Sequence, residues 1–153
     1  MKRLAFLVAL LLAAAGAPVA AQNSLSSFET GALSIETAAG ATHDFTVEIA
    51  ATADQRAQGL MFRDRMAADA GMLFLFEGAQ VRAMWMKNTL IPLDMLFIDG
   101  EGKIVRIEER TVPHSERAIS SGGPVTAVLE LNAGTASRLV IKPGDRVRHP
   151  AFE

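Results

Sequence analysis

The chain has 153 residues, a length that suits one domain with a sizeable core. It contains no cysteine, which excludes disulfides, metal thiolates, a thiol nucleophile and a lipid-modified cysteine at a mature N-terminus. Its 15 basic and 17 acidic side chains give a formal charge of −2 at pH 7, and no basic run stands out, so neither nucleic acid nor an anionic membrane is an expected partner.

The first 21 residues have the pattern of a secretory signal peptide. Lys2 and Arg3 form a basic start, residues 4–15 are an unbroken apolar run, and small residues lead to an expected cleavage site after Ala21. The apolar run is too short to span a bilayer comfortably, so we expect no membrane span after cleavage, the alternative being a signal that is kept as an anchor. The pattern predicts a periplasmic or secreted protein.

The expected mature chain has two parts. Residues 22–31 are rich in Ser and Asn and are typical of a flexible leader, whereas residues 32–153 are expected to form a single β domain. Loss of Lys2 and Arg3 would leave 13 basic and 17 acidic side chains, a formal charge of −4.

Two alternating segments open the domain. Residues 32–37 and 42–50 alternate between apolar and polar side chains, with a glycine-containing turn between them, and predict a β-hairpin. A short helix is expected to begin after this hairpin, because Thr52 and Gln55 have the spacing of a capping box. Gly59 can end that helix, since glycine tolerates the backbone conformation of a helix C-cap.

Residues 71–99 hold most of the large apolar side chains and the only tryptophan, Trp85. Three apolar runs in this stretch are each too short for a helix and have turn residues beside them, which indicates core strands. These runs are residues 72–76, 83–86 and 95–98. Residues 77–80 are expected to form the turn between the first two strands.

The last third of the chain predicts two more long strands, residues 103–109 and 125–131, and a short closing strand at residues 146–148. Asn132 is expected to cap a second short helix. Residues 111–124 show no periodicity, and a connection of this length is often functional or mobile. In all, about eight strands and two short helices predict a mainly β fold, a β-sandwich or open barrel.

Seven short motifs follow one another along the chain: Gly59-Leu60-Met61-Phe62-Arg63, Gly71-Met72-Leu73-Phe74, Trp85-Met86-Lys87-Asn88-Thr89, Pro92-Leu93-Asp94, Val128-Leu129-Glu130-Leu131, Ala133-Gly134 and Lys142-Pro143-Gly144-Asp145. With them the sequence resembles the DUF192 (UPF0127) family over about residues 32–147. The resemblance implies a mainly β fold with jelly-roll-like sheets and implies no function. Met84 departs from the family pattern, because relatives often carry an aromatic residue before the tryptophan.

A polar cluster beside Trp85 is the first candidate site. Lys87, Asn88 and Asp94 could converge with the indole on a cleft that binds a polyol, carboxylate or peptide, with Arg63 as a further ligand-binding residue. Residues 111–124 would form one wall of the cleft. The alternative is structural: the polar groups hydrogen-bond the backbone of their own turn, and Lys87 neutralises Asp94.

Glu130 is the second candidate, because it stands among apolar neighbours in an expected strand. A buried carboxylate must be paired or have its pKa raised, and Arg63 or Arg65 is the expected partner in a core ion pair. The catalytic alternative makes Glu130 and Asp94 an acid/base pair for hydrolysis of a glycoside or a related substrate.

Metal and nucleophilic chemistry have less support. The three histidines lack the spacing of metal ligands, and Met84 and Met86 are explained as core side chains, so we expect no metal and no cofactor. Ser115 follows His114 in the long connection, but the chain has no nucleophile elbow.

Three functional hypotheses follow from the sequence. The preferred one is an exported binding module for a small or extended polar ligand, such as an envelope saccharide or peptide. The second is a hydrolase that uses Asp94 and Glu130, and the third is a non-catalytic structural or interaction protein of the envelope.

Overall fold

The computed structural model describes residues 25–153. The predicted signal peptide lies outside these residues, as does the start of the predicted leader. The elements are, in chain order, β1 (Glu29–Glu36), β2 (Thr42–Ala50), α1 (Ala53–Gln58), β3 (Ala70–Met84), β4 (Leu93–Ile98), β5 (Ile104–Glu108), β6 (Ile119–Asn132), α2 (Thr135–Leu139), β7 (Arg146–Arg148) and the 3₁₀ turn η1 (Pro150–Phe152). Strand β1 therefore begins inside the segment that was predicted to be a flexible leader.

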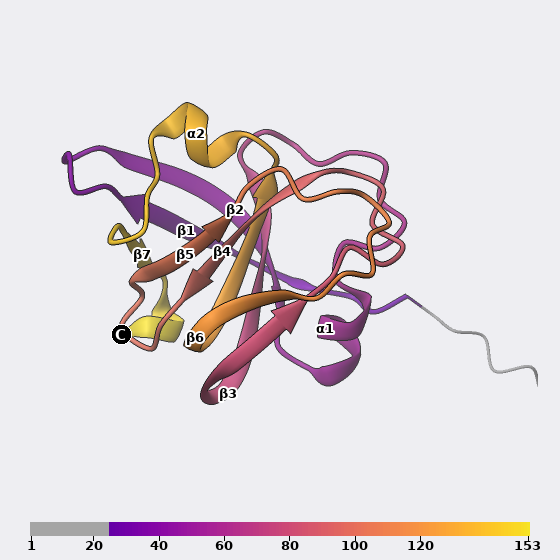
Figure 1. Cartoon of the computed structure of the whole chain (residues 1–153). Coiled ribbons are helices and arrows are strands. Elements are labelled where there is room, and N and C mark those ends of the chain that lie inside the picture. Colours follow the sequence, from indigo (N-terminus) through magenta and orange to yellow (C-terminus); the bar gives the residue numbers. More distant parts are fainter. Residues whose placement is uncertain (1–24) are drawn as a thin grey trace, which may run out of the picture.

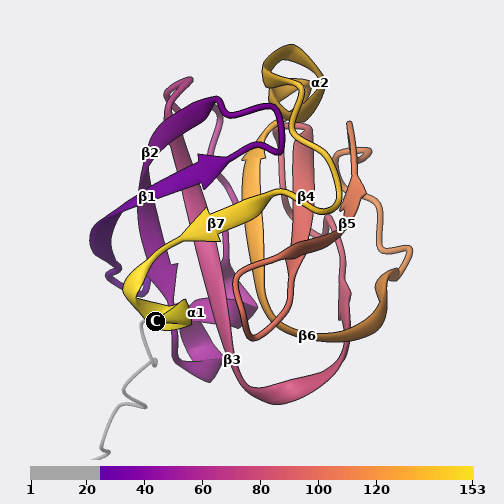
Figure 2. The ribbon, with the colours of Figure 1, turned by 90° about the vertical axis from the view of Figure 1, so that its left-hand side faces the viewer.

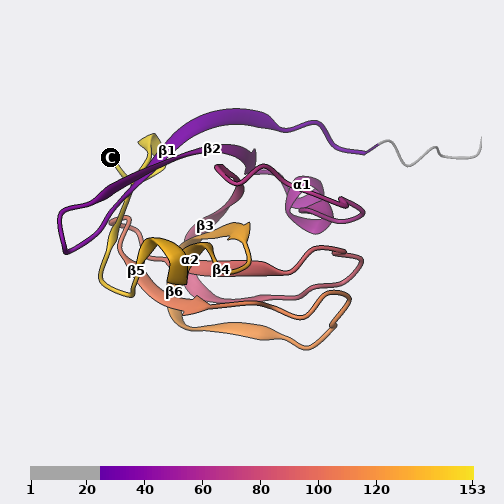
Figure 3. The ribbon, with the colours of Figure 1, turned by 90° about the horizontal axis from the view of Figure 1, so that it is seen from above.

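The described strands form one seven-stranded sheet in the order β5-β4-β6-β3-β2-β1-β7 (Figure 1). The sheet curls until its two edges meet, and a bridge joins Lys103, just before β5, to Arg146 of β7 (Figure 2). Seen from above, β1 and β2 lie on one side, with β4, β5 and β6 on the other (Figure 3). The fold is a nearly closed barrel, which confirms the predicted mainly β class with two short helices.

Strand β3 differs most from the sequence-based expectation. It runs through residues 77–80, which were predicted to be a turn between two strands. Its pairing with β6 shifts register between Leu75 and Gln80, and Gly78 has a φ of 70°. Such irregularities bend a strand without ending it. The outer parts of β3 and β6 therefore turn together towards the side of the molecule where α1 lies (Figure 1). Residues 119–124, which were predicted to belong to the long connection, are the first part of β6.

The central strands are covered on both faces. On β3, Leu73 belongs to one apolar cluster, whereas Met72 and Phe74 belong to another on the opposite face. All six residues of β4 are buried. This is why the central strands have continuous apolar sequences, as expected for strands between two packed layers.

The two helices differ in how well the sequence predicts them. Thr52 and Gln55 form the complete capping box at the start of α1. The predicted cap of α2 is wrong, since Gly134 occupies the N-cap position and Asn132 donates instead to the Met66 and Ala67 carbonyls. No helix within residues 25–153 combines the length and the apolarity needed to cross a membrane.

Gly71 is required by the close approach of β3 to β6. A Cβ atom at this position would lie 2.7 Å from the Glu130 carbonyl oxygen and 2.8 Å from a Leu131 methyl group. We expect Gly71→Ala to lower the free energy of unfolding by about 1–3 kcal/mol, because the strands must separate. Gly123→Ala is the matched control, since a Cβ atom there would meet nothing within 4 Å beyond its own chain neighbours. Urea unfolding compares the two, and equal stabilities would contradict the expectation.

Candidate functional site

A cavity of about 210 Å³ lies where the C-terminal end of α1 faces the outer part of β3. Its walls combine aromatic, aliphatic and polar side chains from α1, the segment after it, β3 and β6. The aromatic residues are Phe74, Phe76 and Trp85, and the polar residues are Arg56, Gln58, Lys87, Thr89 and Glu130. An apolar hollow with a few polar groups is the usual form of a small-ligand site.

Trp85 and Lys87 form the solvent-facing part of the cavity. Trp85 directly follows β3 and is 47% exposed. The Lys87 Nζ lies 5.1 Å from the centroid of the indole ring, which is the geometry of a cation–π contact. None of the ion pairs within residues 25–153 includes Lys87. The cavity therefore presents an aromatic plate with a free ammonium group over it.

Glu130 lies deeper, on β6. Its register partners are Met72 of β3 and Met95 of β4, so all three side chains point to the same face of the sheet. Only 4% of Glu130 is exposed, and its carboxyl forms no hydrogen bond or ion pair with the part of the chain that the structure describes. Burial raises the pKa of this carboxyl to about 8, so it is mostly protonated at neutral pH.

Arg63 is not the partner of Glu130, contrary to the predicted core ion pair. Both of its Nη atoms contact the Glu48 carboxylate on β2, with 3.1 Å between Nη2 and Oε1. Its guanidinium also lies 5.7 Å from the Phe28 ring centroid. These contacts hold Arg63 outside the cavity, and Arg65 takes part in none of the described ion pairs either.

Asp94 is sealed inside the protein on β4, with no exposed surface. Its Oδ1 accepts hydrogen bonds from the backbone N–H groups of Arg110 (2.9 Å) and Gly134 (3.0 Å), and its Oδ2 accepts one from Ala136 (2.9 Å). The carboxylate thereby ties the start of α2 and the turn after β5 to β4. Its backbone contacts are those of a structural residue, as the alternative interpretation of the polar cluster expects.

Register separates Asp94 from Glu130. Asp94 is opposite Leu131, whereas Glu130 is opposite Met95, so the two carboxyl groups point to opposite faces of the sheet. Asp94 does not line the cavity. The expected acid/base pair therefore does not share one cavity, and Lys87 does not neutralise Asp94.

Asn88 does not line the cavity but contacts the segment after α1 that forms part of its wall. It has a φ of 53°, and its backbone oxygen accepts a hydrogen bond of 2.9 Å from the N–H of Phe62, which has a φ of 65°. Its side-chain nitrogen lies 3.9 Å from the sulfur of Met61, a residue that does line the cavity. Left-handed backbone at non-glycine residues is uncommon and often occurs at functional sites.

A second hollow also borders Trp85. It has a volume of about 280 Å³ and is lined by Ala83, Met84, Trp85, Glu116 and Ala118. The last two residues belong to the long connection that precedes β6. The connection therefore lines this second hollow, whereas none of its residues lines the cavity at Lys87 and Glu130, of which it was expected to form a wall.

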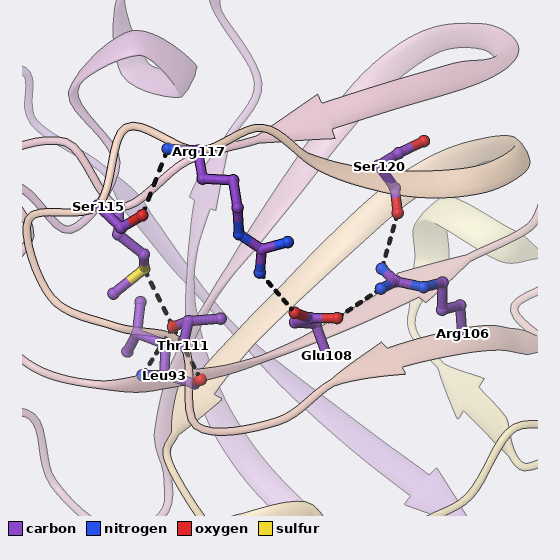
Figure 4. Close-up of polar contacts among 8 residues, drawn as sticks. Leu93, Arg106, Glu108, Thr111, Ser115, Arg117 and Ser120 are labelled. Atoms are coloured by element: carbon purple, nitrogen blue, oxygen red, sulfur yellow. Dashed lines mark hydrogen bonds and ion pairs between the residues drawn. The ribbon is translucent and has the colours of Figure 1, made fainter.

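Side-chain contacts hold this connection in place (Figure 4). The Glu108 carboxylate on β5 accepts hydrogen bonds from Arg106 and from Nη2 of Arg117, the latter at 3.2 Å. The Thr111 hydroxyl donates to the Leu93 carbonyl at 3.0 Å and accepts from its N–H at 3.2 Å. These contacts anchor the connection to β4 and β5 and fix the wall beside Trp85.

Several residues of the cavity, Arg56 among them, have no recognisable signal in the sequence. Arg56 of α1 donates to the Leu75 carbonyl at 2.9 Å, and its guanidinium lies 5.4 Å from the Phe76 ring centroid. These contacts depend on the bend of β3, and no local pattern in the sequence indicates that bend. Within residues 25–153, no group of three or more His, Cys, Asp or Glu side chains could hold a metal ion.

Comparisons with known proteins identify the family, and two of the similar solved structures are described here. The family DUF192, described as Uncharacterized ACR, matches residues 34–149. A protein from Sinorhizobium meliloti 1021, provisionally described as a transcription regulator, is 52% identical with a TM-score of 0.81, over 82% of this chain and 98% of its own. A protein of unknown function from Novosphingobium aromaticivorans DSM 12444 is 37% identical with a TM-score of 0.78, over 88% of this chain and 91% of its own. No curated protein matches the chain.

Proposed function

This chain belongs to the DUF192 family, whose description assigns no activity, and from the geometry of its cavity we propose that it is a binding module for a small polar ligand. The ligand would be an envelope saccharide or peptide, held between Trp85, Lys87 and Glu130. The signal-like N-terminus supports a periplasmic or secreted location. The single observation that carries the proposal is the buried carboxyl of Glu130, which lines the cavity without a partner in the described chain.

The candidate residues Asp94, Lys87 and Glu130 differ in whether the fold already supplies their partners. Asp94 has three backbone donors and no exposed surface, so its role is complete within the fold. Lys87 and Glu130 line one cavity and take part in none of the described ion pairs. A buried polar group without a partner is costly, and a ligand that contacts it removes part of that cost.

The transcription-regulator description of the Sinorhizobium meliloti protein does not transfer easily to this geometry. The α-helices within residues 25–153 contain six and five residues, which is too short for a recognition helix in a DNA major groove. The formal charge of −2 also opposes binding to phosphates. The paired-carboxylate hydrolase is disfavoured as well, because Asp94 and Glu130 lie on opposite faces of the sheet.

Trp85 fluorescence provides the test, because this is the only tryptophan of the chain. We expect a saturable change in its emission on titration with soluble cell-wall fragments, both saccharides and peptides. Lys87→Ala should raise the dissociation constant about tenfold, since within residues 25–153 Lys87 is the only lysine that lines the cavity. Lys142→Ala, at an exposed lysine outside the cavity, is the matched control and should bind as the unmodified protein does. Absence of any response across the panel, with calorimetry also negative, would reject the proposal.

A further inference from the structure

We propose that the ligand of this cavity is a zwitterion, a free amino acid or a very short peptide, whose ammonium group binds Glu130 and whose carboxylate lies near Lys87. The inference rests on the proposed function and names the ligand class for the same cavity. It is carried by a buried carboxyl and an ammonium group that line one hollow together with aromatic rings and take part in none of the described ion pairs.

Glu130 and Lys87 line the same cavity without pairing with each other. Glu130 lies on β6 and is 4% exposed, whereas Lys87 lies at the exposed Trp85. Their charged groups are more than 4.0 Å apart, since they do not form one of the described ion pairs. Arg56 is the third charged residue of the lining, and its guanidinium already contacts the Ala51 and Leu75 carbonyls.

The surroundings of Glu130 favour a cation as its partner. Its neighbours on β3 and β4 are Met72 and Met95, so the sheet supplies no positive charge. Among the rings of the cavity, Phe76 already lies under Arg56 and Arg82 and Trp85 under Lys87, whereas Phe74 takes part in none of the described cation–π contacts, and the face of such a ring attracts an ammonium group. A cationic partner also forms a charge-assisted hydrogen bond, which is stronger than a bond to a neutral hydroxyl.

The size of the cavity limits the ligand. The volume of about 210 Å³ is below the roughly 300–1,000 Å³ of most small-molecule sites, which favours a ligand with few atoms such as a single amino acid. Leu60, Phe74 and Met84 in the lining favour an apolar side chain on that amino acid.

Binding of an ammonium group should release a proton. Without ligand, burial raises the pKa of Glu130 to about 8, so the carboxyl is mostly protonated at pH 7. The ligand ammonium stabilises the ionised form, and the carboxyl proton passes to the solvent. The other charged groups that line the cavity are Arg56 from α1 and Lys87 after β3. Affinity should therefore rise with pH between about 6 and 8 while the ligand keeps its own ammonium proton.

Calorimetry with four probes tests the inference on the purified chain at pH 7. Leucine carries both charges, N-acetylleucine lacks the ammonium, leucinamide lacks the carboxylate, and N-acetylglucosamine is a neutral sugar. We expect leucine to bind best and N-acetylleucine at least tenfold more weakly. Titration of leucine in two buffers of different ionisation enthalpy should show close to one proton released per ligand bound.

Three variants assign the contacts. Glu130→Gln should weaken leucine binding at least tenfold and abolish the proton release, and Lys87→Ala should weaken leucine more than leucinamide. Glu116→Gln changes a carboxylate in the neighbouring hollow and is the matched control, with affinity and proton release unchanged. Urea unfolding of each variant confirms that it is folded during the titration.

The outcomes separate this inference from the proposed function. Equal affinity for leucine and N-acetylleucine, or binding of the sugar alone, would overturn the zwitterion while a binding module remained. Binding of leucine with no proton release, unchanged in Glu130→Gln, would overturn the role of Glu130. If neither these probes nor the cell-wall fragments bind, both the inference and the proposed function are rejected.

Discussion

Replacement of Asp94 by alanine is expected to lower the free energy of unfolding by about 3–5 kcal/mol. The carboxylate is fully buried and accepts three backbone hydrogen bonds, from Arg110, Gly134 and Ala136. Its removal leaves these donors without their acceptor in a space too enclosed for free access of water. The cost of an unsatisfied buried donor is about 1–3 kcal/mol, and the three losses overlap because they share one site.

Urea unfolding followed by circular dichroism measures this effect. Asp99→Ala is the matched control, since that side chain also accepts two backbone hydrogen bonds, from Glu101 and Lys103, in an exposed turn. We expect the control to lose only about 1 kcal/mol, because water replaces the carboxylate there. Equal losses at the two aspartates would contradict the structural role assigned to Asp94.

Asp94→Asn separates stability from binding. The amide oxygen can keep the bonds from Arg110 and Gly134, but the amide nitrogen would face the N–H of Ala136. We therefore expect an intermediate loss of stability with unchanged ligand affinity, because Asp94 does not line the cavity. A stable variant that had lost its ligand would instead place Asp94 in the binding site.

The features that could be predicted from the sequence are those formed by residues close together in the chain. The capping box of α1 needs only Thr52 and Gln55, three residues apart, and it forms as predicted. Trp85 and Lys87 are two residues apart at the end of one strand, so their proximity on one face could also be anticipated. The bend of β3 could not, since residues 77–80 have the composition of a turn, and the strand continues through them by an irregularity in its pairing with β6 between Leu75 and Gln80.

The register between neighbouring strands could not be predicted from the sequence. The faces on which Asp94 and Glu130 lie are set by the register of β4 on β6. Register can be read from a sequence when one face is apolar and the other polar. Every residue of β4 is buried, so no alternation distinguishes its faces. The partner of Arg63 was missed for a similar reason, because Glu48 meets it only through packing of a loop on β2.

The stability of the protein should fall as pH rises from about 4.5 to about 8, through Glu130. Below this window the carboxyl is protonated in the folded and the unfolded chain, so it favours neither state. Within the window the unfolded chain ionises it while the folded chain keeps the proton, because burial raises the folded-state pKa from 4.5 to about 8. Unfolding then releases a proton, and each pH unit lowers the free energy of unfolding by about 1.4 kcal/mol.

Glu130→Gln isolates this contribution from the other titrating groups. The amide has a similar shape and no charge, so the variant should match the unmodified protein near pH 5 and exceed it in stability at pH 9. The difference could reach about 5 kcal/mol, an upper limit because partial hydration of the cavity lowers the desolvation cost. Urea unfolding at five pH values between 5 and 9 measures it, with Glu116→Gln as the control that should give a flat difference. A flat difference for Glu130→Gln as well would mean that the carboxyl finds a partner or water in the free protein, and the cavity would then lack the unpaired acid that defines it as a site.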